Sequence, residues 1–136
     1  MQEGENRPDG MILCYPVITG GEYSHPGSFR MMLGKEDPTE EELSLYSLEK
    51  HVDERTSPAF LVHTAEDTCV PVENSLLMAM ALSRAKVPFE LHVYPKAPHG
   101  CALANEVTSG AWDAWNDQAL AAWHEQSVAW AKRKWN

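Results

Sequence analysis

Three short apolar runs stand out along the chain, at residues 11–15, 59–63 and 89–94, and proline or glycine flanks each of them. Runs of this length between such residues predict strands rather than helices. The first run, Met-Ile-Leu-Cys-Tyr, does not alternate polar with apolar positions. We therefore expect it to be a strand buried on both faces, as in a parallel sheet.

Helical spacing appears between and after these runs. Residues 37–42, Asp-Pro-Thr-Glu-Glu-Glu, are typical of a helix start, with a capping carboxylate, proline at the first helical position and acids in the first turn. A longer helix is predicted over residues 73–86 and a last helix over about 116–132. The face expected inward is Leu77, Met80, Ala81 and Arg84 in the first of these, and Leu120, Trp123, Ser127 and Trp130 in the second.

The order of these elements predicts an α/β fold with three parallel strands and flanking helices. We expect residues 1–136 to form a single α/β domain. Residues 19–56 are expected to be a cap-like excursion after the first strand, with turns at Gly20-Gly21 and Pro26-Gly27.

Composition narrows the classes of function. A net charge of −9 argues against nucleic acid and anionic membranes as partners, and no apolar run approaches the length of a membrane span. Three cysteines without a CxxC pair favour neither a disulfide framework nor a metal site, and we expect no metal. A soluble, cytoplasmic protein is the default expectation.

Candidate chemistry follows the second and third strands. Asp67 lies in the segment after the second strand, and His99 lies 32 positions later in the segment after the third. Because the carboxyl ends of parallel strands share one rim of a sheet, these side chains could meet there. An imidazole paired with a carboxylate can move protons in catalysis, but a buried Asp–His pair is also a common structural hydrogen bond.

Both segments resemble those of a known superfamily. Residues 63–75, HTAEDTCVPVENS, resemble the acid loop of α/β-hydrolases, and residues 94–100, YPKAPHG, resemble their histidine loop. Residues 9–18 look like the sixth strand of that fold, and residues 24–28 with Leu33-Gly34 are similar to the segment that helps to cover its active site. The resemblance points to the bacterial esterase branch similar to acetyl-xylan esterases and dienelactone hydrolases, and the chain would correspond to strands 6 to 8.

The resemblance implies a serine-type hydrolase of small carboxylic esters, with short acyl or sugar acetyl groups as substrates and with no cofactor. Asp67 would be the triad acid and His99 the base, and the serine would precede both. The G-x-S-x-G elbow and an HGG-type oxyanion loop are absent from this sequence. We therefore expect the chain alone to be inactive, and its open strand edge at residues 11–15 to pair with another copy or with a separate N-terminal piece.

Two other classes of function stay open, namely an inert fragment or interaction module, and the tail of a serine peptidase of the same fold. Among nearby residues, we expect Glu66 to be solvated and His63 to be a core residue. The remaining candidates are His25 as a residue that could line the pocket, Trp112 and Trp115 as residues that could touch substrate, His92 as structural, Cys14 as a buried small hydrophobic residue, and His51, His124, Cys69 and Cys101 without a role.

Overall fold

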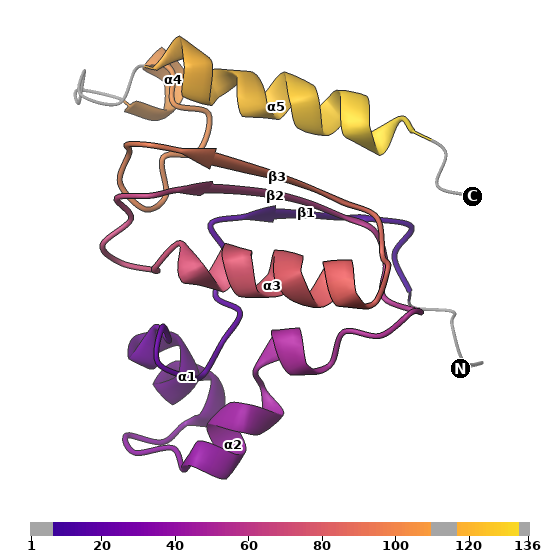
Figure 1. The fold of residues 1–136 in the computed structure, drawn as a ribbon. Helices are drawn as coiled ribbons and strands as arrows, with labels where there is room; N and C mark the ends of the chain where they lie inside the picture. The colour runs from indigo at the N-terminus through magenta and orange to yellow at the C-terminus, as the bar shows by residue number, and fades with distance from the viewer. Residues whose placement is uncertain (1–6, 110–116, 134–136) are drawn as a thin grey trace.

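The computed structural model describes residues 7–109 and 117–133. In this part of the chain, three parallel strands pair in the order β1 (Met11–Cys14), β2 (Ala59–Thr64) and β3 (Phe89–Tyr94). Helix α3 (Glu73–Arg84) covers one face of the sheet and helix α5 (Gln118–Ala131) covers the other (Figure 1). The prediction of three parallel strands with flanking helices is confirmed.

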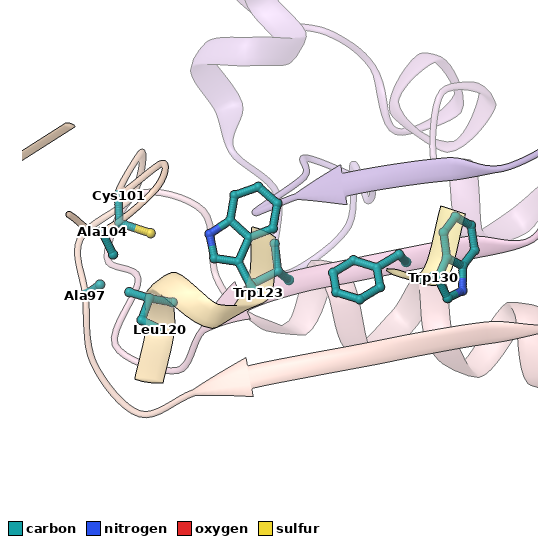
Figure 2. Packing of buried hydrophobic residues seen from close by; sticks show 8 residues of the cluster. Ala97, Cys101, Ala104, Leu120, Trp123 and Trp130 are labelled. Atoms are coloured by element: carbon teal, nitrogen blue, oxygen red, sulfur yellow. The ribbon is translucent and has the colours of Figure 1, made fainter. Parts of the chain in front are cut away.

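Strand β2 is the centre of the sheet, and every one of its residues is buried. Its side chains alternate between the two faces, as strand geometry requires. Phe60 and Val62 pack in the cluster beneath α5, which includes Trp123 and Trp130 (Figure 2). On the opposite face, the cluster against α3 contains Ile18, Ala59, Leu61, Met78, Leu82 and Val87. The predicted inward face of the last helix is confirmed, since Leu120, Trp123, Ser127 and Trp130 are its buried residues.

The predicted inward face of α3 is wrong. The helix buries Asn74, Ser75, Met78, Ala79 and Leu82. Met80 is 50% exposed, and Arg84 is exposed as well. Apolar residues occur on nearly every side of this helix, so their spacing does not choose a face. The choice depends on which side can satisfy the polar groups of Asn74 and Ser75.

Strand β1 is less buried than predicted. Ile12 is 45% exposed, and the other residues of the strand are half-buried. In the described part of the chain β1 has one neighbour, β2, so its outer edge carries main-chain groups without a strand partner. The expectation of burial on both faces is therefore wrong for this strand as it stands.

The excursion contains more helix than predicted. Helix α1 (Pro26–Leu33), helix α2 (Glu40–Leu45) and a 3-10 turn at Leu48–Lys50 follow β1, and a short helix α4 (Glu106–Ser109) precedes α5. The cap of α2 is Thr39 rather than Asp37. Thr39 and Glu42 form a reciprocal capping box, which satisfies two main-chain N–H groups at once and places the helix start after Pro38.

Candidate active site

The acid loop, residues 65–72, lies between β2 and α3. Its main chain turns around the side chain of Asp67. The Asp67 side chain is fully buried. Its Oδ1 accepts hydrogen bonds from the N–H groups of Cys69 and Val70, each at 2.9 Å. Because the loop turns back on this carboxylate, the second oxygen is left to face the neighbouring loop.

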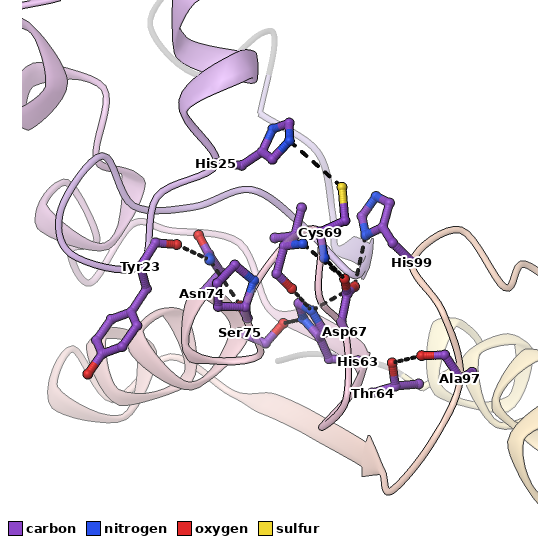
Figure 3. Close-up of polar contacts among 12 residues, drawn as sticks. Tyr23, His25, His63, Thr64, Asp67, Cys69, Asn74, Ser75, Ala97 and His99 are labelled. Carbon is purple, nitrogen blue, oxygen red and sulfur yellow. Dashed lines mark hydrogen bonds and ion pairs between the residues drawn. The ribbon is translucent and has the colours of Figure 1, made fainter.

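The structure brings Asp67 and His99 together at one rim of the sheet. Asp67 Oδ2 lies 2.8 Å from His99 Nδ1 (Figure 3). A carboxylate can only accept, so Nδ1 carries the hydrogen of this bond and the lone pair of the neutral ring is on Nε2. The His99 side chain keeps 32% of its surface exposed. The couple therefore combines a buried acceptor with an imidazole that solvent or a ligand can reach.

Two opposing effects act on the Asp67 carboxyl. Burial raises its pKa, since it disfavours the charged form. The N–H of Val70, the ring of His99 and the N–H of Cys69 all bond the charged form and together outweigh the burial, so the pKa of Asp67 lies below its ordinary value. The carboxylate is consequently ionised at neutral pH and can orient the imidazole.

The histidine loop is anchored to both layers beneath it. Thr64 Oγ1, at the end of β2, donates to the carbonyl of Ala97 at 2.8 Å. Beyond His99, Trp123 Nε1 of α5 donates to the carbonyl of Ala102 at 2.8 Å. Gly100 has a φ of 76°, a left-handed conformation that glycine adopts without steric cost. The loop that carries His99 is thus held on both sides of the imidazole.

Tyr15 is a residue of this site that the sequence analysis missed. It follows β1 directly, and its ring contacts the His99 ring edge-on, with the centroids 4.9 Å apart. Its φ of 38° is left-handed, which is uncommon for a residue other than glycine and often marks a functional site. Its position after the first strand was the available signal, because all three strands end at the same rim.

The remaining candidates divide into near and distant residues. His25 caps the start of α1, and its Nε2 lies 3.7 Å from the exposed Cys69 Sγ, beside the Asp67–His99 couple (Figure 3). Glu66 is exposed, as expected. His63 is wholly buried among hydrogen-bond partners, which confirms it as a core residue. Trp112 and Trp115 lie outside the described residues.

Other side chains agree with a structural role. His92 stacks on Phe60, with ring centroids 4.9 Å apart, and bonds Glu90.

Among the residues that the structure describes, no three histidine, cysteine or acidic side chains are grouped so that they could hold a metal ion. Nor is any helix in that part of the chain long and apolar enough to cross a membrane.

The chain is similar in sequence and in fold to known proteins. The chain is 51% identical over 106 residues to endo-1,4-beta-xylanase B of Butyrivibrio fibrisolvens. This alignment covers 78% of this chain and 16% of that protein. An acetyl ester-xyloside bifunctional hydrolase from Caldicellulosiruptor lactoaceticus superposes with a TM-score of 0.70 at 43% identity, covering 90% of this chain and 43% of that one. MGS-M1, an α/β-hydrolase enzyme from a deep-sea metagenome, superposes with a TM-score of 0.68 at 28% identity, covering 95% of this chain and 45% of that one.

The chain thus spans less than half the length of each of these proteins. The structural matches confirm that its three-stranded sheet belongs to the α/β-hydrolase fold. The sequence profile of the prolyl oligopeptidase family matches residues 25–134, which is most of the chain. The chain therefore belongs to the prolyl oligopeptidase family of α/β-hydrolases.

Proposed function

We propose that this chain supplies the acid and the histidine of a serine-type carboxylic-ester hydrolase, with Asp67 as the orienting acid and His99 as the general base and acid. The observation that carries the proposal is the 2.8 Å bond between Asp67 Oδ2 and His99 Nδ1. This bond leaves Nε2, on the exposed imidazole, as the atom that can take a proton.

The chemistry follows from that tautomer. His99 Nε2 takes the proton of a serine hydroxyl while the serine oxygen attacks the ester carbonyl. Asp67 stabilises the imidazolium that forms, and its lowered pKa keeps it ionised during the step. His99 then returns the proton to the departing alcohol, and the acyl-serine remains. A water molecule, deprotonated by the same Nε2, attacks this acyl-enzyme, and His99 gives that proton to the departing serine oxygen as the acid is released.

Short acyl esters, including acetyl groups on sugars, are the substrates that we propose. The support is the 43% identity to an acetyl ester-xyloside hydrolase, whose name specifies both the acetyl ester and the sugar. The xylanase relative is also described as acting on a sugar polymer.

The serine of this reaction must come from residues other than these 136, because no G-x-S-x-G segment occurs among them. We propose that the chain alone is inactive, since loss of the nucleophile and of the oxyanion donors each lowers the rate by orders of magnitude. A fluorophosphonate probe, which reacts with activated serines, should leave the isolated chain unlabelled. Stoichiometric labelling would overturn this part of the proposal.

The open edge of β1 is where we propose that the serine-bearing part of the sheet docks. β1 has a single strand neighbour in the described chain, and Ile12 is 45% exposed there. In the absence of that segment, the same edge should pair with a second copy. Light scattering across a concentration series measures this self-association, and Ile12→Lys should reduce it. A strictly monomeric wild-type chain at high concentration contradicts the pairing.

A chimera tests the catalytic proposal directly. Residues 7–133 would replace the matching 43% of the Caldicellulosiruptor enzyme, and we propose that the rest of that enzyme supplies the serine. We expect the chimera to hydrolyse p-nitrophenyl acetate, and Asp67→Asn or His99→Ala to lower kcat by about 10⁴-fold. Glu66→Gln is the matched control, because this carboxylate is adjacent but exposed, and it should leave kcat unchanged. Equal rates for Asp67→Asn and Glu66→Gln would refute the assignment of the acid.

A peptidase is the second candidate, and the name of the matched family favours it. Peptide and ester hydrolysis use the same acid and base, so the residues do not separate them. The same chimera would be assayed with a chromogenic prolyl peptide beside the acetyl ester. Faster cleavage of the peptide than of the ester would favour the peptidase.

A further inference from the structure

His63 lies beneath the acid loop, at the point where three segments meet. It belongs to β2, and no part of it is exposed. Its Nε2 lies 2.9 Å from the carbonyl of Val70 and 3.4 Å from Asp67 Oδ2, while its Nδ1 lies 2.7 Å from Ser75 Oγ in α3 (Figure 3). One ring therefore connects the strand, the acid loop and the helix.

The partners determine the tautomer of this ring. A carbonyl and a carboxylate can only accept, so Nε2 must carry a hydrogen. Burial lowers the pKa of His63 below its ordinary value, and it outweighs the smaller raising effects of the Val70 carbonyl and Asp67. The ring is therefore neutral, and Nδ1 is left as the acceptor of the Ser75 hydroxyl hydrogen.

Ser75, His63 and Asp67 have the order of partners of a catalytic triad, with a hydroxyl on one ring nitrogen and a carboxylate near the other. They are not a second reactive centre. Ser75 and His63 are both 0% exposed, so no substrate can reach the hydroxyl. The 3.4 Å separation from Asp67 is also longer than the 2.8 Å bond that the same oxygen makes with His99.

We propose that His63 is a positioning residue for Asp67. The inference rests on the proposed function. The Nε2–H of His63 donates to the carbonyl of Val70, and the N–H of Val70 donates to Asp67 Oδ1. The ring therefore fixes the position of the acid loop relative to β2. The same Nε2–H also lies near Asp67 Oδ2, the oxygen that faces His99. With Nδ1 anchored on α3, the ring keeps Oδ2 in line with the catalytic imidazole.

A purely structural His63 predicts something different. In that case a substitution lowers stability, and any loss of activity follows the amount of folded protein. A positioning residue instead changes kcat of the folded enzyme and leaves KM unchanged, because a buried ring cannot touch substrate. Misplacement of a reacting group by about 1 Å lowers a rate by about 100-fold, so the effect is large enough to measure.

Two amide substitutions separate these cases. In His63→Gln, the amide nitrogen of the new side chain reaches the place of Nε2 and keeps the donor to the acid loop. The shorter side chain in His63→Asn reaches only the place of Nδ1, so it keeps a partner for Ser75 and loses that donor. In the chimera, we expect His63→Asn to lower kcat by about 10- to 100-fold at constant KM, and His63→Gln to restore most of it. Equal kcat values for the two folded variants would overturn the inference.

Proton and nitrogen NMR of the histidine rings in the 136-residue chain test the same inference without hydrolysis. We expect the His63 ring to carry hydrogen on Nε2 alone at neutral pH. The His99 Nδ1–H signal should persist in His63→Gln and broaden or vanish in His63→Asn, with Asp67→Asn as the control that removes its acceptor. A His63 ring with hydrogen on Nδ1, or an unchanged His99 signal in His63→Asn, would overturn the inference.

The outcomes separate the two proposals. If Asp67→Asn leaves the activity of the chimera intact, the proposed function fails. If Asp67→Asn abolishes activity while His63→Asn retains the wild-type kcat, only the positioning role fails. Circular dichroism of each variant establishes the folded fraction used to calculate kcat. If His63→Asn does not fold, Ser75→Ala is used in its place. Ser75→Ala removes the hydroxyl bonded to His63 Nδ1, so the His99 Nδ1–H signal should weaken. An unchanged signal again overturns the inference.

Discussion

Asn74 lies in the first turn of α3, and its fully buried carboxamide joins that helix to the segment after β1. Its Oδ1 accepts the N–H groups of Ile18 at 2.9 Å and Thr19 at 3.0 Å. Its Nδ2 donates to the carbonyl of Tyr23 at 2.8 Å and to that of Pro71 at 3.0 Å. A single side chain thus satisfies main-chain groups of two other segments.

Asn74→Ala removes these bonds with unequal consequences. The Pro71 carbonyl keeps the N–H of residue 74, and the exposed Tyr23 segment can turn to water. The N–H groups of Ile18 and Thr19 are buried, and neither has another acceptor in the part of the chain that the structure describes. Each of these two buried groups left without a partner costs about 1–3 kcal/mol, so we expect the free energy of unfolding to fall by about 2–6 kcal/mol.

Urea unfolding followed by tryptophan fluorescence measures this loss. Ser83→Ala, at an exposed position of the same helix, is the matched control and should change the free energy of unfolding by less than about 0.5 kcal/mol. Asn74→Asp should also destabilise, because its second oxygen would face two carbonyl oxygens that Nδ2 now bonds. If Asn74→Ala cost no more than Ser83→Ala, the proposed importance of these hydrogen bonds would be refuted.

Three further predictions concern stability. Because burial lowers the pKa of His63, the unfolded chain binds a proton there at higher pH than the folded chain. The free energy of unfolding should therefore fall as the pH drops below about 6.5. His63→Gln should make this free energy less dependent on pH, as measured by urea titrations at several pH values. Gly20→Ala should destabilise by about 1–3 kcal/mol in thermal unfolding, because a Cβ there would lie 2.6 Å from the Leu43 carbonyl oxygen; an unchanged Tm would contradict this. Trp123→Phe, which removes the 2.8 Å bond to the Ala102 carbonyl but keeps most of the ring, should lower stability by about 1 kcal/mol, against about 3–5 kcal/mol for Trp123→Ala; a Trp123→Phe variant as stable as the wild type would show that the hydrogen bond is irrelevant.

The candidate site could be inferred before the structure because its signal is local. Asp67 and His99 each follow a strand directly, and parallel strands present their carboxyl ends on one rim. Tyr15 could have been added by the same rule, since it follows β1. Its contact with His99 depends on a left-handed main chain at position 15, and no residue type in the sequence announces that conformation.

The spacing of apolar residues predicts the buried face of α5 but not that of α3. The buried positions of α5 form one stripe, from Leu120 to Trp130, so its spacing alone identifies the inward face. Leucine, methionine and alanine residues of α3 lie on nearly every side of the helix. Their spacing therefore does not determine which side of the helix faces the sheet. Its buried face contains Asn74 and Ser75, whose partners come from the segment after β1, the acid loop and His63.

By itself, the sequence determined the three strands, their parallel order and the rim where an acid and a histidine meet. Apolar runs, flanking prolines and the handedness of crossovers act within short stretches of chain and need no distant partner. Tertiary structure alone decided the rotation of α3, the exposure of β1 and the tautomer of His63. Each of these depends on which groups from separate segments come together and satisfy one another once they are buried, and that pairing exists only in the folded chain.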